Sequence, residues 1–532
     1  MKKMWIYLAV PMALLNGCQR QQALLDDAES LTAQVEENPG EAPDGLEAPE
    51  RPDMEPDTET AGEEPDGLEA RERSDAEPAG EQPEGRQPQF QVSAEALAGV
   101  ILGQNFIKEA PFGGSTVAIA RSGEREASRI TEEEIEAMVR EAAFDLETVV
   151  KNGQTVVLKP NLVQMIVDST GEKLDQEVNG VTTDWRVMKA VLKMVRELNP
   201  DGRVYIMEGS ATGPTRDVME YFKYTDEYME GVDGFICLEE DCGAWQDFDA
   251  GEVVKVDLPD GLLHKTYYFN RILYEADVVI SIPTLKTSSG VVVTAGIKNV
   301  SIGTPPGNLY GMGPDTPSKQ KMVSHKITDG ELDKWIYDYY KAKPVDYVIV
   351  DGLQGFQSGP VPMSSERRET DKMNMGLVLA GKDPVAVDTV CCLVMGWDPE
   401  SVGYLNLFRE RDGLGKTEDI RVKGVFADQV RKPFSIYKEK LGGVPAQTED
   451  GPELSGSVRT EGNRLFLQYQ AGAGTRKVEI YVDGQFQWSQ PVAEEGEEGT
   501  ICFTVPGLVL GEHEIQAQAY DRFLNKTTKK FR

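Results

Sequence analysis

Four continuous apolar runs, each ending in a charged residue, constrain the fold of this chain more than any other feature. They are TVVLK, RVYIME, DVVISIPTLK and DYVIVD, which end at Lys159, Glu208, Lys286 and Asp351. A run without polar alternation is typical of a strand buried on both faces, and such strands belong to parallel sheets covered by helices. Helix-like segments lie between the runs. We therefore predict an α/β central domain with a mostly parallel sheet flanked by helices.

The elements between these runs support the same architecture. A helix is expected from Thr131, because Glu134 three residues later completes a capping-box pattern. Asp383 and Pro384 form a favourable N-cap and first-turn pair for a later helix, PVAVDTVCCLVMG. The remaining predictions are strands over 117–120 and MGLVLAG, and helices over 184–198 and near 332–340.

The charged strand ends define the predicted site. Parallel strands bring their carboxyl ends to one edge of the sheet, where ligands of open α/β folds bind. A second lysine, Lys298, stands beside Asn299 in what we interpret as a glycine-rich loop after the DVVISIP strand. The predicted ligand-binding residues are Lys159, Asn161, Lys286, Lys298, Asn299 and His325. The acids predicted to bind a divalent metal or to balance the lysines are Glu208, Asp351, Asp383 and Asp388.

Each of these residues also has a structural interpretation. A single charge after a strand is usually the first solvated residue of a loop, and Asp383 is more simply a helix cap than a ligand. Asp388 lies in a helix that is apolar nearly all round, so we expect it to be buried and paired with a lysine or a cation. Cys391 and Cys392 in the same helix are interpreted as core residues.

Standard catalytic and cofactor motifs are missing from the sequence. There is no GxxxxGK[ST], no GxGxxG after a strand, no GxSxG and no HExxH, so no residue is assigned a catalytic role. The cysteine spacing encodes neither a zinc ribbon nor an iron-sulfur cluster. Cys237 and Cys242 are compatible with a disulfide or with two free thiols. A net charge of −35 argues against nucleic acid as a partner.

The N-terminus predicts export. Residues 1–18 contain two lysines, an apolar run too short to span a bilayer, and the ending LNGC, which resembles a bacterial lipobox. Lipidation of Cys18 would anchor the exported protein to the bacterial cell membrane or cell surface. An ordinary cleaved signal peptide is the alternative.

Residues 19–91 have the composition of a disordered acidic tether. Between residues 21 and 90 there are 22 acidic residues against 4 arginines, and PDGLEA occurs at Pro43 and again at Pro65. So little apolar surface cannot offset the entropy lost on folding. A specific acidic ligand for a basic partner is the alternative function.

After the central domain, assigned to residues 92–445, the chain changes to short alternating strands. Residues 446–532 contain RLFLQYQ, KVEIYV, QFQWS, TICFTV and HEIQAQAY, with a hairpin signal at Asp483 and Gly484. The pattern resembles a small all-β immunoglobulin-like or fibronectin-like sandwich. Such a module suggests a spacer or a cell-surface contact, with carbohydrate binding as the alternative. Residues 442–451, rich in Gly and Pro, are predicted to be an exposed linker.

Five segments together are similar to a known family. VVLKPNLV, VYIMEGS, ADVVISIPTLKT with GIKNVSIG, YVIVDGLQGFQSGP and LAGKDPVAVDTV resemble the domain-of-unknown-function family numbered 362, in the same order over most of residues 115–425. The resemblance implies an exported or cytoplasmic α/β domain of unsettled activity, sometimes joined to a ferredoxin-like module. This chain lacks the cluster cysteines, and it has Ser288 and Ser289 where family members often carry a histidine, which weakens a metal role for that segment.

These features predict an exported, membrane-anchored lipoprotein whose α/β domain binds a small carboxylate- or phosphate-bearing ligand. The sequence is compatible with binding alone or with chemistry on the ligand, and with a divalent metal. The competing interpretation is a non-catalytic surface-displayed accessory or adhesion protein in which the charged cluster is purely structural.

Overall fold

The computed structural model describes most of the chain from Phe112 to Phe531. The described residues are 112–167, 171–211, 214–238, 253–306, 310, 330–436, 443–448, 450–461, 464–493, 496–504 and 513–531. The predicted signal peptide with Cys18 and the predicted acidic tether lie outside them, as do Cys242 and His325.

A ten-stranded sheet organises the α/β part of the described chain. Its main path runs in the order β12-β1-β11-β10-β7-β2-β3-β4, with β8 pairing with β10 and β9 pairing with β8. Its strands are β1 (Ser115–Arg121), β2 (Thr155–Pro160), β3 (Arg203–Glu208), β4 (Gly234–Cys237), β7 (Val278–Ile282), β8 (Thr284–Ser288), β9 (Val292–Thr294), β10 (Tyr347–Phe356), β11 (Lys372–Gly381) and β12 (Ile420–Gly424). Along the main path, only β11 is antiparallel to its neighbours, so the predicted mostly parallel sheet is confirmed.

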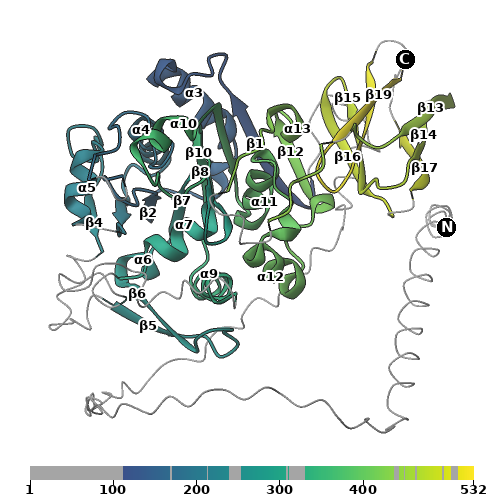
Figure 1. Ribbon diagram of the computed structural model, residues 1–532. Coiled ribbons are helices and arrows are strands. Elements are labelled where there is room, and N and C mark those ends of the chain that lie inside the picture. The colour runs from purple at the N-terminus through teal and green to yellow at the C-terminus, as the bar shows by residue number, and fades with distance from the viewer. Residues whose placement is uncertain are drawn as a thin grey trace, which may run out of the picture. The chain divides into compact units, whose positions relative to one another are not determined.

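Helices cover both faces of this sheet (Figure 1). The longer ones are α3 (Glu132–Ala142), α4 (Trp185–Leu198), α7 (Gly296–Gly303), α9 (Glu331–Ala342), α11 (Pro384–Val394) and α12 (Gly403–Asp412). The shorter ones are α5 (Thr215–Tyr221), α6 (Arg271–Glu275), α10 (Ser365–Thr370) and α13 (Ala427–Val430). On β2, Val156 and Leu158 pack with α3 and α4, whereas Val157 belongs to the cluster of α7, α9, α11 and α12. Burial on both faces explains why the strands are continuously apolar. None of the helices within these described ranges is long and apolar enough to cross a membrane.

Most predicted elements form, and three differ from expectation. The Thr131 side chain caps α3 by accepting a hydrogen bond from the Glu134 amide at 3.2 Å, as predicted. Lys298 and Asn299 lie on helix α7 rather than in a loop, which corrects the prediction. Lys286 lies within strand β8, and β10 continues past Asp351 to Phe356 instead of ending there.

The C-terminal segment forms two small antiparallel sheets. One contains β13 (Leu454–Glu461), β14 (Arg464–Ala471) and β17 (Glu497–Thr504). The other contains β15 (Lys477–Val482), β16 (Gln485–Pro491), β18 (Ile515–Tyr520) and β19 (Lys526–Phe531). A further two-stranded sheet, β5 (Val253–Asp257) and β6 (Thr266–Asn270), belongs to the α/β part. Asp483 and Gly484 connect β15 and β16 with positive φ angles of 49° and 77°, which confirms the hairpin.

The C-terminal sheets pack against the α/β part. Phe523 and Leu524 belong to the same hydrophobic cluster as α11. The Arg522 guanidinium pairs with Asp398 at 2.9 Å and with Glu400 at 2.7 Å. In the predicted linker, Val444 is 51% exposed, yet its carbonyl accepts a hydrogen bond from the Asp398 amide at 2.7 Å. Most of the described part of this linker is therefore exposed, but Ala446 is buried in the core of the domain and its amide donates to the Gly396 carbonyl at 2.9 Å.

Candidate functional site

A buried ion pair on neighbouring strands forms the base of the site. Lys159 precedes the last residue of β2 and Glu208 ends β3, so the parallel pairing of these strands places the two side chains together. The Lys159 Nζ lies 2.6 Å from Glu208 Oε1, and both residues are at most 1% exposed. The carboxylate also accepts hydrogen bonds from the amides of Leu162 at 2.6 Å and Gly209 at 2.8 Å. The charges of this pair are thus satisfied by each other and by backbone amides, which a buried ion pair requires.

Two asparagines connect this pair to the second lysine. The Asn299 Oδ1 atom accepts hydrogen bonds from Asn161 Nδ2 at 2.9 Å and from Lys159 Nζ at 3.4 Å. The Asn299 Nδ2 atom donates to the Lys159 carbonyl and to Ser281 Oγ, both at 3.1 Å. The Asn161 Oδ1 atom accepts from Lys286 Nζ at 2.5 Å. Lys159, Asn161, Lys286 and Asn299, predicted as one site, therefore form one hydrogen-bonded network.

Lys286 is fully buried, and among the described residues its Nζ makes hydrogen bonds to neutral oxygens alone. Its Nζ donates to Asn161 Oδ1 and to the Val181 carbonyl, each at 2.5 Å. No carboxylate pairs with it among the residues that the structure describes. Burial, followed by the charge of Lys298, lowers the pKa of Lys286 well below its usual range. This amine therefore carries a proton far less readily than an ordinary lysine.

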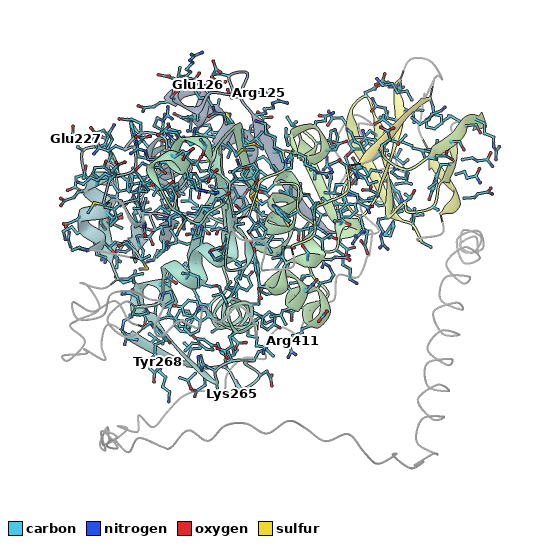
Figure 2. All side chains as sticks on the ribbon, viewed as in Figure 1. Arg125, Glu126, Glu227, Lys265, Tyr268 and Arg411 are labelled. Atoms are coloured by element: carbon cyan, nitrogen blue, oxygen red, sulfur yellow. The ribbon has the colours of Figure 1, made fainter. Side chains whose placement is uncertain are left out.

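Lys298 is the third lysine of the site and the one nearest to solvent. It is 9% exposed on α7, and its Nζ donates to Thr294 Oγ1 at 3.1 Å. Burial lowers the pKa of Lys298 to about 8, so its ammonium form still predominates at neutral pH. In contrast, charged side chains such as Glu227, Lys265 and Arg411 lie exposed at the periphery (Figure 2).

The last residue of α7 is a glycine because Lys159 occupies the space beside it. A Cβ at Gly303 would lie 2.5 Å from Lys159 Nζ and 3.1 Å from Glu208 Oε1. Any larger residue would therefore displace the ion pair. Helix α7 thus contributes the side chains of Lys298 and Asn299 to the site. Gly303 contributes the space that Lys159 occupies, because it has no side chain.

Asp388 holds the start of α7 and does not pair with a lysine. Its carboxylate accepts hydrogen bonds from the amides of Gly296 at 2.7 Å and Ile297 at 3.2 Å, and from the Tyr404 hydroxyl at 3.0 Å. The prediction that Asp388 is buried is confirmed, but the expected lysine or cation is replaced by the positive end of a helix. Burial raises the pKa of Asp388 to about 7.

A buried loop before α4 was missed by the sequence analysis. The Val181 carbonyl receives Lys286, and Thr183 Oγ1 accepts from the Asn161 amide at 2.8 Å. The Asp184 amide donates to Asp351 Oδ2 at 2.8 Å, and burial raises the pKa of Asp351 to about 7. The sequence predicted a helix from Asp184 but none of these acceptors, because a backbone carbonyl leaves no residue-type signature.

The four predicted metal-binding acids serve separate contacts. Glu208 pairs with Lys159, Asp351 accepts backbone amides, and Asp388 caps α7. Asp383 caps α11 by accepting from the Val385 amide at 2.9 Å and also accepts from Ser115 Oγ at 2.5 Å. Within the described ranges, no group of three or more His, Cys, Asp and Glu side chains is arranged to hold a metal ion. Cys391 and Cys392 are free thiols, and both are buried, as is Cys237.

The fold and the site define a class: an α/β domain with a buried, lysine-rich polar network at the carboxyl ends of parallel strands. In comparison with known families, residues 156–393 match the family described as "Domain of unknown function (DUF362)". Every predicted site residue except Cys18 falls in this matched range.

The chain is also 27% identical over 271 residues to thylakoid-associated protein sll1697 from Synechocystis sp., a match that covers 50% of this chain and 71% of that protein. Matches to solved structures are weak. OgpA from Akkermansia muciniphila gives a TM-score of 0.14 at 10% identity and covers 19% of this chain and 36% of that chain. The spore cortex lytic enzyme SleM from Clostridium perfringens gives 0.16 at 7% identity, with 77% of both chains covered. Such TM-scores do not indicate a shared fold.

Proposed function

We propose that the α/β domain binds a small ligand bearing a carboxylate or phosphate group at Lys286 and Lys298. One observation carries this proposal: three buried lysines share the site, but only Lys159 has a carboxylate partner among the described residues. Because Glu208 pairs with Lys159, no carboxylate among the described residues compensates the positive charge of Lys298. A buried charge is costly unless it is paired, so an anion at this place would be stabilised by charge-assisted hydrogen bonds.

Thermal unfolding of the full chain in the presence of inorganic phosphate or glyoxylate tests this proposal. We expect at least one of these anions to raise the midpoint of unfolding at pH 7, since a ligand of the folded state stabilises it. Lys298→Met should abolish the increase, because methionine keeps an unbranched apolar side chain but lacks the charge. Lys265→Met, on an exposed lysine, is the matched control. An equal response in both variants, or none in the wild type, would argue against an anion site at Lys298.

A purely structural role is the second candidate, and the complete pairing of the acids favours it. Glu208, Asp351 and Asp388 accept their hydrogen bonds from groups within the protein. In that case neither the wild type nor Lys298→Met should respond to the anions. Lys298→Met should also stabilise the fold, because an apolar side chain replaces an unpaired buried charge. The C-terminal sheets would then provide the contacting surface of an accessory protein.

For location, we propose an exported lipoprotein anchored through Cys18, with residues 19–91 as a tether. The N-terminal sequence supports this proposal, and the Synechocystis relative is named as thylakoid-associated. We further propose that the two C-terminal sheets form an immunoglobulin-like module that contacts the cell surface. Their antiparallel pairing and their shared hydrophobic cluster support this assignment.

A further inference from the structure

We propose that Lys286 is a neutral amine that forms an imine with a carbonyl group of the bound anion. The ligand would then be a small oxo acid, with a carboxylate for Lys298 and a reactive carbonyl for Lys286. This inference rests on the anion site proposed above, and it adds a covalent step and a narrower ligand class.

The number of acceptors around the Lys286 Nζ fits a neutral amine. A neutral amine has two N–H donors and one lone pair, whereas an ammonium group has three donors and no lone pair. The Lys286 Nζ has two acceptors, Asn161 Oδ1 and the Val181 carbonyl, each at 2.5 Å. Both donors of a neutral amine are therefore used, and its lone pair is left for a carbon electrophile. An ammonium group would have a third N–H without an acceptor among the described residues.

The charges around Lys286 favour the same state. Lys159 and Lys298 both disfavour a third positive charge, and Glu208, the acid that acts on Lys286, already pairs with Lys159. Burial adds the largest contribution to the lowered pKa of Lys286. A lysine desolvated next to other cations is an effective nucleophile, because it is deprotonated at neutral pH.

Lys298 complements this amine as the anion-binding group. Its pKa of about 8 keeps it mainly charged at pH 7, and its 9% exposure makes it the lysine that an entering ligand meets first. A carboxylate held by Lys298 would bring an adjacent carbonyl carbon towards Lys286. Proximity of this kind raises the local concentration of the electrophile at the amine.

The step balances without any redox partner. The lone pair of Lys286 Nζ attacks the carbonyl carbon and forms a C–N bond. The carbonyl oxygen takes up two protons, both from the amine in the net reaction, and leaves as water. One amine and one carbonyl compound thus give one imine and one water, and protonation of the imine gives an iminium ion.

Reductive trapping of the full chain with glyoxylate and sodium cyanoborohydride at pH 7 tests the proposal. Reduction of the imine leaves a carboxymethyl group on the modified lysine, which peptide mass spectrometry locates. We expect Lys286 to be labelled at least about tenfold faster than exposed Lys265. The reason is that less than about one in a thousand ordinary lysine side chains is deprotonated at pH 7. Lys298→Met should slow the labelling of Lys286 but not of Lys265.

The outcomes separate the two proposals. If glyoxylate raises the unfolding midpoint in a Lys298-dependent manner but Lys286 is labelled no faster than Lys265, the imine is excluded and the anion site stands. If neither glyoxylate nor phosphate changes the midpoint and Lys286 is not labelled, both proposals fail. The decisive labelling is measured on the wild-type chain, so it does not depend on a variant that folds poorly.

Discussion

Replacing Asp388 with asparagine tests the capping of α7 by a buried carboxylate. The wild-type side chain is 0% exposed and accepts hydrogen bonds from two helix amides and from Tyr404. Asparagine has nearly the same volume and resembles the protonated acid, because it carries one oxygen acceptor and no charge. The substitution therefore removes the titration of residue 388 with little change in packing.

The effect should depend on pH in a defined direction. The pKa of Asp388 is raised from 3.8 to about 7 in the folded protein, so the folded state binds this proton more tightly than the unfolded state. The resulting stabilisation is fully present below pH 3.8 and is lost as the pH rises through about 7. Between pH 5 and pH 8 the free energy of unfolding of the wild type should fall by about 2 to 3 kcal/mol relative to that of Asp388→Asn.

Urea unfolding at pH 5 and pH 8, followed by circular dichroism, measures this difference. Other titrating groups are present in both proteins and cancel in the comparison if they act independently of residue 388. Tyr404→Phe is the matched control, because it removes one hydrogen bond to the carboxylate but leaves Asp388 able to titrate. It should therefore keep a pH dependence of the same sign as the wild type, shifted to higher pH, because the Tyr404 hydrogen bond lowers the pKa of Asp388. Parallel stability curves for wild type and Asp388→Asn would refute a raised pKa at this carboxylate.

Three further predictions concern the ion pair, the glycine beside it and the anchor. Lys159→Met should cost about 3 to 5 kcal/mol in urea unfolding because it leaves Glu208 buried without a cation, and adding Glu208→Gln should recover part of that loss. Gly303→Ala should cost about 1 to 3 kcal/mol in the same assay and abolish any anion response, whereas Gly123→Ala, which meets no atom within 4 Å, should not. Cys18→Ser should move the protein from the membrane to the soluble fraction on centrifugation, and a wild type that is already soluble would contradict lipid anchoring.

The strands were predictable because burial on both faces produces a pattern that few other elements share. β3 ends at Glu208 as predicted, and β7 coincides with the DVVISIP run up to Pro283. The convergence of Lys159 and Glu208 followed from one rule, that parallel neighbours end at the same edge of the sheet. Their pairing was not predicted, because it depends on β2 and β3 being neighbours in the sheet.

Helix α7 was not predictable from its own residues. It begins and ends with glycine and has no capping side chain at its N-cap residue, Ala295. Its cap is supplied by Asp388, which lies 92 residues beyond Gly296 in the chain. A tertiary contact here overrides weak local helix propensity. The acceptor at Val181 was equally hidden, because every residue has a carbonyl and only the fold selects the one that is used.

The dependence of α7 on Asp388 has a consequence for the order of folding. Asn161 on the β2 side and Asn299 on α7 are 138 residues apart, and the contact that fixes α7 forms only once Asp388 is available. Contacts this distant in sequence are slow to form because a long loop must close first. During synthesis, which starts at the N-terminus, β2 and β3 would be complete well before the contacts that hold the lysines of the site can form. Chains truncated before residue 388 should therefore retain secondary structure yet lack a formed site.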